Sequence, residues 1–250
     1  MGSIKLAVIL AAGVGSRMFP YNKRLPKGFL KINGIPIIKR SIHNLLNAGI
    51  EKIIIGTGHK SKEYEKLASD YPVVCKYNPE YTRTGSMYTL YNMRESIRSN
   101  FLLLESDILY DGHGLEVLIK DPHPNIVLAS GLTGAGDEVF IEANRKRYLT
   151  AMSKQKSSLR SIFGELTGIS KVFLPAVNAM NKFAFDRFYR RPDLDYEYAM
   201  VAVSGRYKFY VLKIEDYIWC EIDDYMHLQR ARNLIFPKLN LKEQASNHPL

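Results

Sequence analysis

Short apolar runs alternate with amphipathic segments along the first half of the chain. Apolar runs of about four to eight residues are typical of buried strands, and apolar residues at helical spacing are typical of the helices that cover them. The predicted strands are Leu6–Leu10, Lys52–Gly56, Val73–Tyr77 and Phe101–Glu105, and the predicted helices are Ile37–Ala48, Ser61–Ser69 and Ser86–Ile97. This alternation predicts a mostly parallel sheet covered by helices, which is an α/β fold.

The pattern changes after the predicted strand Asn125–Ser130. The next predicted strands have no long helix between them, so we expect an antiparallel or mixed region there; they are Glu138–Ala143, Tyr148–Ser153 and Glu165–Val172. The remaining predicted elements are helices at Ala184–Tyr189, Tyr196–Ser204 and 224–234 and strands at Tyr207–Lys213 and Ile218–Ile222. We assign residues 1–236 to a single domain, and interpret the polar, aperiodic residues 237–250 as a tail or the start of a linker.

The composition is that of an ordinary globular domain with a basic surface. Of the 250 residues, 46% are hydrophobic and 24% are charged, which excludes a disordered or fibrous chain. The formal net charge of +10 favours anionic ligands, but the basic residues are scattered instead of forming the stripe with interleaved aromatics that nucleic-acid binding requires. A nucleic-acid-binding module is therefore the disfavoured alternative. No apolar stretch is long enough to cross a bilayer.

The two cysteines, Cys75 and Cys220, both lie in apolar stretches that are predicted to be strands. Buried free thiols are the simplest interpretation, because the chain shows neither a disulfide framework nor a zinc-binding spacing. Free thiols are typical of a reducing compartment, so we expect a cytoplasmic protein.

A glycine-rich loop, Ala11-Ala12-Gly13-Val14-Gly15-Ser16-Arg17, follows directly on the first predicted strand. Glycines at such a place let successive backbone N–H groups turn toward phosphate oxygens, and Arg17 adds a permanent positive charge. The loop is not a P-loop, because no Gly-Lys-Ser/Thr follows, and Met18 stands where the third glycine of a dinucleotide-binding turn is expected. Taken alone, the loop predicts phosphate binding and nothing narrower.

The segment Leu10–Met18, together with Leu25-Pro26-Lys27-Gly28-Phe29-Leu30, resembles the signature of the nucleotidyltransferase family that activates sugar phosphates and phosphocholine. The resemblance implies a three-layer α/β/α Rossmann-like fold with a mostly parallel mixed sheet and a small antiparallel acceptor-binding region. It also implies that Arg17 and Lys27 contact phosphates as catalytic residues. The loop residues that would wrap a nucleoside triphosphate are Leu10, Ala11, Ala12, Gly13, Gly15 and Ser16.

Two aspartates follow predicted strands at places suited to a metal ion. Asp107 comes after the strand Phe101–Glu105, and Asp223 after Ile218–Ile222. Ligands of open α/β sheets bind at the carboxyl ends of the strands, and Mg²⁺ prefers carboxylate oxygens. The resemblance implies that both aspartates hold Mg²⁺. Asp223 directly precedes a predicted helix, so an N-cap is its alternative, and Glu105 is interpreted as a strand residue instead of a ligand.

The nucleobase and acceptor sites are indicated by the middle segments of the chain. The resemblance implies that Gly85 and Ser86 contact the base, and Gly58 lies at another predicted strand end that would line the same pocket. Four segments look closest to the 2-aminoethylphosphonate cytidylyltransferases: Gly56–His59, Thr84–Met87, Phe101–Asp107 and Ala129–Glu138. An acceptor of that kind carries a primary ammonium group, for which the candidate carboxylates are Asp137, Glu138, Glu165 and Glu197. Tyr196 is a further acceptor candidate, as part of an aromatic lining that would suit a quaternary ammonium.

The implied reaction joins CTP to 2-aminoethylphosphonate and releases pyrophosphate. Phosphocholine, or a sugar 1-phosphate, is the alternative acceptor within the same class, and an aromatic lining that binds a quaternary ammonium would favour phosphocholine. Some enzymes of this group are fused to an aminotransferase, which would give residues 237–250 a use as a linker. The sequence leaves a homodimer open.

Overall fold

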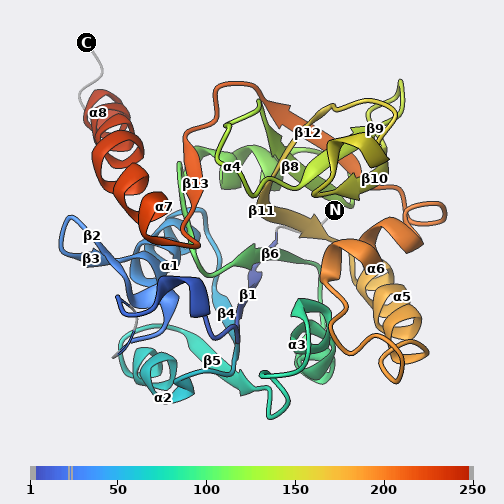
Figure 1. Ribbon diagram of the computed structural model, residues 1–250, viewed down its shortest axis with the longest axis horizontal. Helices are drawn as coiled ribbons and strands as arrows, with labels where there is room; N and C mark the ends of the chain where they lie inside the picture. The colour runs from blue at the N-terminus through green and yellow to red at the C-terminus, as the bar shows by residue number, and fades with distance from the viewer. Residues whose placement is uncertain (1–3, 22, 24, 248–250) are drawn as a thin grey trace.

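The computed structural model describes residues 4–247 apart from residues 22 and 24. Within these residues the central sheet has nine strands in the order β10-β9-β11-β6-β1-β4-β5, and β8 and β12 continue it from β11 (Figure 1). Its strands are β1 (Leu6–Ala11), β4 (Lys52–Thr57), β5 (Val73–Tyr77), β6 (Phe101–Glu105), β8 (Ile126–Ser130), β9 (Phe140–Ala143), β10 (Leu149–Ser153), β11 (Gly164–Val172) and β12 (Tyr210–Ile214). Two small sheets pair β2 (Lys31–Ile32) with β3 (Ile35–Pro36) and β7 (Ile108–Tyr110) with β13 (Trp219–Glu221).

The direction of the strands changes at β11. The strands β6, β1, β4 and β5 are parallel, whereas β11 runs antiparallel to β6, β8 and β9. The predicted mostly parallel sheet with an antiparallel region after Ser130 is therefore confirmed. This arrangement places the antiparallel part next to the carboxyl ends of β1 and β6, where a ligand of the parallel part would bind.

Helices cover both faces of the sheet (Figure 1). They are α1 (Ile37–Asn47), α2 (Ser61–Glu65), α3 (Ser86–Asn92), α4 (His113–Lys120), α5 (Leu174–Phe185), α6 (Tyr196–Val203), α7 (Tyr225–Arg230) and α8 (Phe236–Asn247). None of the helices in the described part of the chain is long and apolar enough to cross a membrane. Helix α1 ends as predicted, because Gly49 follows with φ +87°, a conformation that terminates helices and favours glycine.

The alternation of side chains along β1 builds two separate cores. Leu6, Val8 and Leu10 pack with α3, α5 and α6 on one face, whereas Ala7 and Ile9 pack with α1, α2 and α4 on the other. Successive residues of a strand point to opposite faces, so an unbroken apolar run such as Leu6–Ala11 fits a strand that is buried on both sides. The result is the expected three-layer α/β/α arrangement.

A third apolar cluster holds the end of the chain against the body of the domain. It includes Met18 after the glycine-rich loop, Cys220 in β13, and Leu228 and Leu239 from the last two helices. Residues 237–247, which were interpreted as a tail or the start of a linker, belong to α8, and Leu239 on this helix is buried. Most residues of α8 are polar and few of them contact the core. The sequence therefore shows no clear helical period of apolar residues there. Whether the segment continues into a linker stays a prediction.

Three helices (α4, α5 and α8) and three strands (β2, β3 and β7) were not predicted from the sequence. The three strands are only two or three residues long, which is too short for a clear alternating pattern, and α4 has only eight residues. Helix α5 is apolar on most sides, so its amphipathic signal is weak, and the predicted helix Ala184–Tyr189 is wrong, because α5 ends at Phe185 and turns follow. Both cysteines are free, with Cys220 buried and Cys75 partly buried.

Candidate active site

The small sheet of β7 and β13 brings the two predicted metal-binding aspartates together. Asp107 lies between β6 and β7, and Asp223 lies two residues after β13. Strand β13 pairs antiparallel with β7, and the backbone N–H of Ile222 donates to the carbonyl oxygen of Asp107 at 3.0 Å. Antiparallel pairing therefore places the start of one strand beside the end of the other, which joins segments 116 positions apart in the chain.

Lys27 and Arg17 neutralise these aspartates. The Lys27 Nζ atom lies 2.5 Å from Asp107 Oδ2 and forms a second ion pair with Asp223 Oδ1, while the Arg17 guanidinium pairs with Asp223 Oδ2. Burial would raise the pKa of Asp223, but the Lys27 ammonium outweighs this and holds the pKa well below its ordinary value. Burial would likewise lower the pKa of Lys27, but Asp107 and Asp223 raise it above its usual range. Both members of this cluster therefore stay charged.

The alternative interpretation of Asp223 as a helix cap is excluded by its neighbour. The side chain of Asp224 accepts a hydrogen bond from the backbone N–H of His227 and thereby caps α7. Asp223 is buried and directs both carboxylate oxygens to Arg17 and Lys27. It is therefore free of a capping function and faces the site.

The glycine-rich loop leaves β1 at the edge of a cavity of about 270 Å³. Gly15 adopts a left-handed conformation with φ +65°, which starts the 3-10 turn Ser16–Met18. Five of the six predicted loop residues line the cavity, namely Leu10, Ala11, Ala12, Gly13 and Gly15. Ser16 is exposed at the start of the turn instead. Lys27 and Asp107 also line the cavity, which brings the two halves of the sequence signature to one place.

Of the three residues predicted for the nucleobase, Gly85 and Ser86 line the cavity and Gly58 does not. Gly85 and Ser86 line the cavity at the start of α3, where the Ser86 hydroxyl contacts Asp195 and accepts from the backbone N–H of Tyr196. Gly58 lies behind the loop, where a Cβ atom would come within 2.6 Å of the Ala12 carbonyl oxygen. Its lack of a side chain therefore allows two loops to pack closely.

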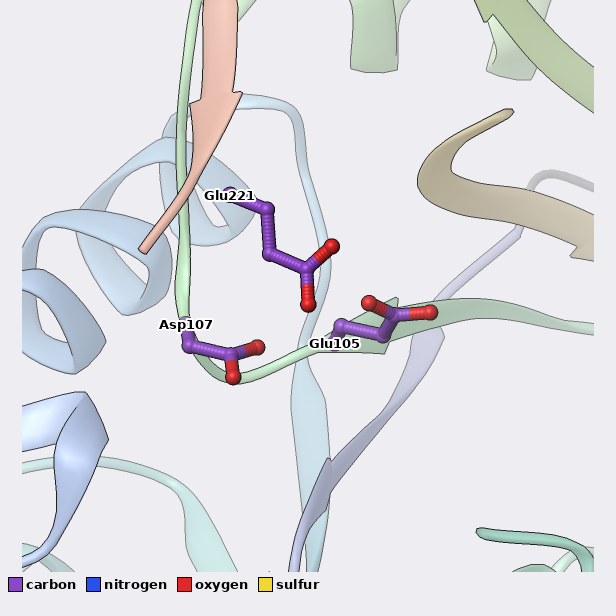
Figure 2. Close-up of side chains that lie close together, drawn as sticks. All are labelled: Glu105, Asp107 and Glu221. Atoms are coloured by element: carbon purple, nitrogen blue, oxygen red, sulfur yellow. The ribbon is translucent and has the colours of Figure 1, made fainter. Parts of the chain in front are cut away.

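Glu105, which was predicted to be a strand residue and does end β6, and Glu221, which the sequence analysis did not assign, complete an acidic cluster around Asp107. Figure 2 shows the Glu221 carboxylate pointing between Asp107 and Glu105, and oxygens of these three residues lie within 4.8 Å of one another. Burial, followed by the nearby carboxylates, raises the pKa of Glu105 to about 7 and that of Glu221 to about 10. The missed signal is the repeated Glu-x-Asp spacing, because residues two apart on a strand point to the same side.

A second, narrower cavity of about 60 Å³ adjoins the first. Four residues line both cavities: Glu105, Lys154, Glu197 and Glu221. The acceptor candidates Asp137, Glu138 and Glu165 line the narrow cavity, and Tyr196 lines the wide one. The structure therefore gathers all five predicted acceptor residues around two adjoining cavities.

The five acceptor candidates differ in how their polar atoms are used. Both oxygens of Glu165 accept from Thr133, at 2.8 Å from its backbone N–H and 2.9 Å from its hydroxyl, so Glu165 fixes a loop. The Tyr196 hydroxyl donates to Glu105 Oε1 at 2.8 Å. Glu197 Oε2, by contrast, is buried without a hydrogen-bond partner among the described residues. Burial, and then the charge of Glu105, raises the pKa of Glu197 to about 8.

The carboxylates around Asp107 and Asp223 form a donor set that suits a divalent cation. Besides the cluster of Figure 2, oxygens of Asp137, Glu221 and Asp223 also lie within 4.8 Å of one another. Hard oxygen donors at the carboxyl ends of parallel strands are the ligands that Mg²⁺ takes together with phosphate oxygens. Asp107 and Asp223 are the members that also face the glycine-rich loop and Lys27.

Known proteins resemble this chain in sequence and in fold. A CMP-5′-(3-aminopropyl)phosphonate synthase from Streptomyces rubellomurinus is 25% identical over 239 residues, which are 87% of this chain and 37% of that protein. A 2-aminoethylphosphonate cytidylyltransferase from Lancefieldella rimae is 37% identical over 86 residues, which are 34% of this chain and 35% of that protein. The matches span little more than a third of the length of these two relatives.

The fold is also that of a solved enzyme. The structure of the CTP:phosphocholine cytidylyltransferase from Streptococcus pneumoniae superimposes with a TM-score of 0.79 and 22% identity, over 93% of this chain and 99% of that one. The sequence pattern of the MobA-like NTP transferase domain matches residues 7–169, which is more than half of the chain and includes the glycine-rich loop, Lys27 and Asp107. The chain therefore belongs to the family of MobA-like NTP transferase domains.

Proposed function

We propose that this chain is a Mg²⁺-dependent cytidylyltransferase that transfers CMP from CTP to 2-aminoethylphosphonate and releases pyrophosphate. The observation that carries this proposal is the pair of adjoining cavities between the glycine-rich loop and the buried glutamates. The wide cavity is lined by the loop and Lys27, and the narrow one by six carboxylates together with Lys154 and Arg230. A triphosphate and an acceptor with a cationic group fit these two linings.

The nucleotide side of the proposal rests on the loop and its two cations. Gly13, which has open space around it, and Gly15, which makes a left-handed turn, both line the cavity, and glycines at such a place let backbone N–H groups approach phosphate oxygens. Lys27 and Arg17 supply positive charge beside the same cavity. The choice of cytosine as the base is supported by the names of the relatives, two of which are described as cytidylyltransferases acting on small phosphonate or phosphocholine acceptors.

The metal would be held by Asp107 and Asp223. When bound, Mg²⁺ neutralises charge on the triphosphate and orients its oxygens. The same two carboxylates contact Lys27, so the lysine ammonium lies beside the residues that would hold the metal. Positive charge from Lys27 and Arg17 then stabilises the negative charge that develops on the departing pyrophosphate.

The acceptor side of the proposal rests on Glu105, Glu197 and Glu221. Their carboxyl groups are buried at the junction of the two cavities, and Glu197 Oε2 has no hydrogen-bond partner among the described residues. A primary ammonium offers three N–H donors to such oxygens, whereas a quaternary ammonium offers none. The lining therefore favours an aminoalkylphosphonate over phosphocholine.

The chemistry requires no general base from the protein. A phosphonate oxygen is already anionic near neutral pH, so it attacks the α-phosphorus of CTP directly while the bond to the pyrophosphate oxygen breaks. The protein contributes positioning, through the ammonium at one end of the acceptor and the triphosphate at the other. The two Glu-x-Asp segments place the ammonium site and the metal site side by side, which sets the distance between the two substrates.

A panel of acceptors tests this proposal. The purified protein is incubated with CTP and Mg²⁺ and one of four acceptors, namely 2-aminoethylphosphonate, 3-aminopropylphosphonate, phosphocholine or glucose 1-phosphate, and pyrophosphate release is followed. We expect the fastest release with 2-aminoethylphosphonate, and none after the metal is removed by chelation. An Asp107→Asn variant is the control for background hydrolysis. Release with phosphocholine and none with either phosphonate would overturn the choice of acceptor.

A further inference from the structure

His227 connects the buried aspartate Asp223 to the loop that carries Asp137. The histidine is buried on α7, four residues after Asp223. Its Nδ1 atom accepts a hydrogen bond from the backbone N–H of Asp223 at 3.4 Å, and its Nε2–H donates to the carbonyl oxygen of Ala135 at 3.2 Å. Because a carbonyl oxygen only accepts, these two contacts fix the ring as the tautomer protonated at Nε2.

The loop that His227 contacts is tied to the domain at two further places. Arg230, one turn later on α7, donates to the carbonyl oxygen of Thr133 at 3.3 Å. Glu165 accepts from both the backbone N–H and the hydroxyl of the same threonine. Of the three residues that hold this loop, His227 is the one that also contacts the backbone of Asp223, a proposed metal ligand.

The two partners of His227 belong to the two sides of the site. Asp223 pairs with Lys27 and Arg17 on the nucleotide side, whereas Ala135 and Asp137 line the narrow cavity on the acceptor side. The Asp137 Oδ2 atom is buried without a hydrogen-bond partner among the described residues and lies 3.6 Å from His227 Nδ1. The imidazole ring thus fills the space between a metal-binding segment and an acceptor-lining segment.

We propose that His227 is a positioning residue that holds the Asp223 backbone and the loop Thr133–Asp137 in place relative to each other through one hydrogen bond on each side of its ring. The acceptor part of this inference rests on the proposed function. The metal part concerns the placement of Asp223 alone and does not depend on the identity of the acceptor. Residues that orient metal ligands typically change metal affinity about 10- to 100-fold when they are replaced.

The two contacts can be separated by substitution, because asparagine and glutamine each reproduce one nitrogen of the ring. In His227→Asn, the amide oxygen takes the place of Nδ1 and can accept from the Asp223 N–H, but the side chain is too short to reach Ala135. In His227→Gln, the amide nitrogen takes the place of Nε2 and donates to Ala135, but Asp223 loses its acceptor. His227→Leu removes both contacts, and His123→Leu is the control at a histidine that stacks on Tyr210 outside the site.

The test measures Mn²⁺ binding by electron paramagnetic resonance in the presence of CTP, hydrogen exchange of the loop amides 133–137, and the KM for 2-aminoethylphosphonate. We expect His227→Gln to bind Mn²⁺ about tenfold more weakly with little change in loop exchange or KM. We expect His227→Asn to keep the Mn²⁺ affinity but to show faster loop exchange and a KM raised about tenfold. His227→Leu should show all three defects, and His123→Leu none.

The inference is overturned if His227→Leu matches the unaltered protein in Mn²⁺ affinity and loop exchange. It is also overturned if the asparagine and glutamine variants show the same combined loss as the leucine variant, because His227 would then only support the fold; melting temperatures of all variants are measured alongside. If no phosphonate yields pyrophosphate with the unaltered protein, the proposed function fails, while Mn²⁺ binding and loop exchange still decide the part played by His227.

Discussion

Replacing Glu197 with glutamine tests the proposed acceptor site at a carboxylate that lines both cavities. The side chain lies at the junction of the two cavities, and its Oε2 atom is buried without a hydrogen-bond partner among the described residues. The substitution keeps the shape of the side chain and removes the negative charge. It should therefore weaken binding of a cationic acceptor and leave binding of CTP unchanged.

The size of the effect follows from the surroundings of this carboxylate. A hydrogen bond between charged partners contributes about 1.5–3 kcal/mol. Burial raises the pKa of Glu197 to about 8. At pH 7 the carboxyl must first lose its proton to form this charged hydrogen bond, which costs about 1.4 kcal/mol and offsets part of the contribution. The expected loss of kcat/KM for 2-aminoethylphosphonate is then at most about tenfold at pH 7 and rises to about 10- to 100-fold at pH 9, where the carboxylate is charged in the free protein.

The assay is initial-rate pyrophosphate release at varied acceptor concentration with saturating CTP. Glu116→Gln, on the exposed face of α4, is the matched control for loss of one negative charge. A Glu197→Gln variant with an unchanged KM for the acceptor at both pH values would refute the assignment of the ammonium site to this cluster.

Three further outcomes follow from the same structure. The carboxyl of Glu197 is neutral below its pKa of about 8 and charged above it, so the KM for 2-aminoethylphosphonate should fall as the pH rises from 7 to 9. A KM that does not change with pH in Glu197→Gln would identify Glu197 as the titrating group. Lys27→Met should slow pyrophosphate release by about 100-fold or more, because it removes the cation beside both aspartates, and near-normal turnover would exclude Lys27 from the reaction. Gly85→Ala should lower the melting temperature and weaken CTP binding, because its Cβ would lie 2.4 Å from the carbonyl oxygens of Asp193 and Leu194; Gly205→Ala, with open space around it, should change neither.

The strands were easier to predict than the helices, and the cause is burial. Strands such as Leu6–Ala11 and Phe101–Glu105 are covered on both faces, so they stand out as short apolar runs. Helix α5 packs against both α6 and α3, so apolar residues occupy much of its surface and the helical period is weak. Helix α8 has the opposite composition and only a narrow buried contact at Leu239.

The residues proposed for the nucleotide leave a clearer pattern in the sequence than those proposed for the acceptor. Gly13, Gly15 and Lys27 lie close together in the sequence, so their spacing is informative without knowledge of the fold. The acceptor side depends on Glu105, Glu197 and Glu221, which come from three distant elements and meet only in the folded chain. A single glutamate at the end of a strand carries no such spacing.

Because β13 pairs with β7, the chain returns to the site near its C-terminal end, and different parts of the chain line the two cavities. The glycine-rich loop, Lys27 and Asp107 come from residues before 110, whereas most of the lining of the narrow cavity comes from residues after 130. Lys154, Asp195 and Tyr196 from this later part also line the wide cavity. Under the proposed function, exchanging residues 131–222 between relatives with different acceptors would therefore replace the acceptor lining and part of the wall of the wide cavity, while Asp107, Lys27 and the glycine-rich loop stay in place.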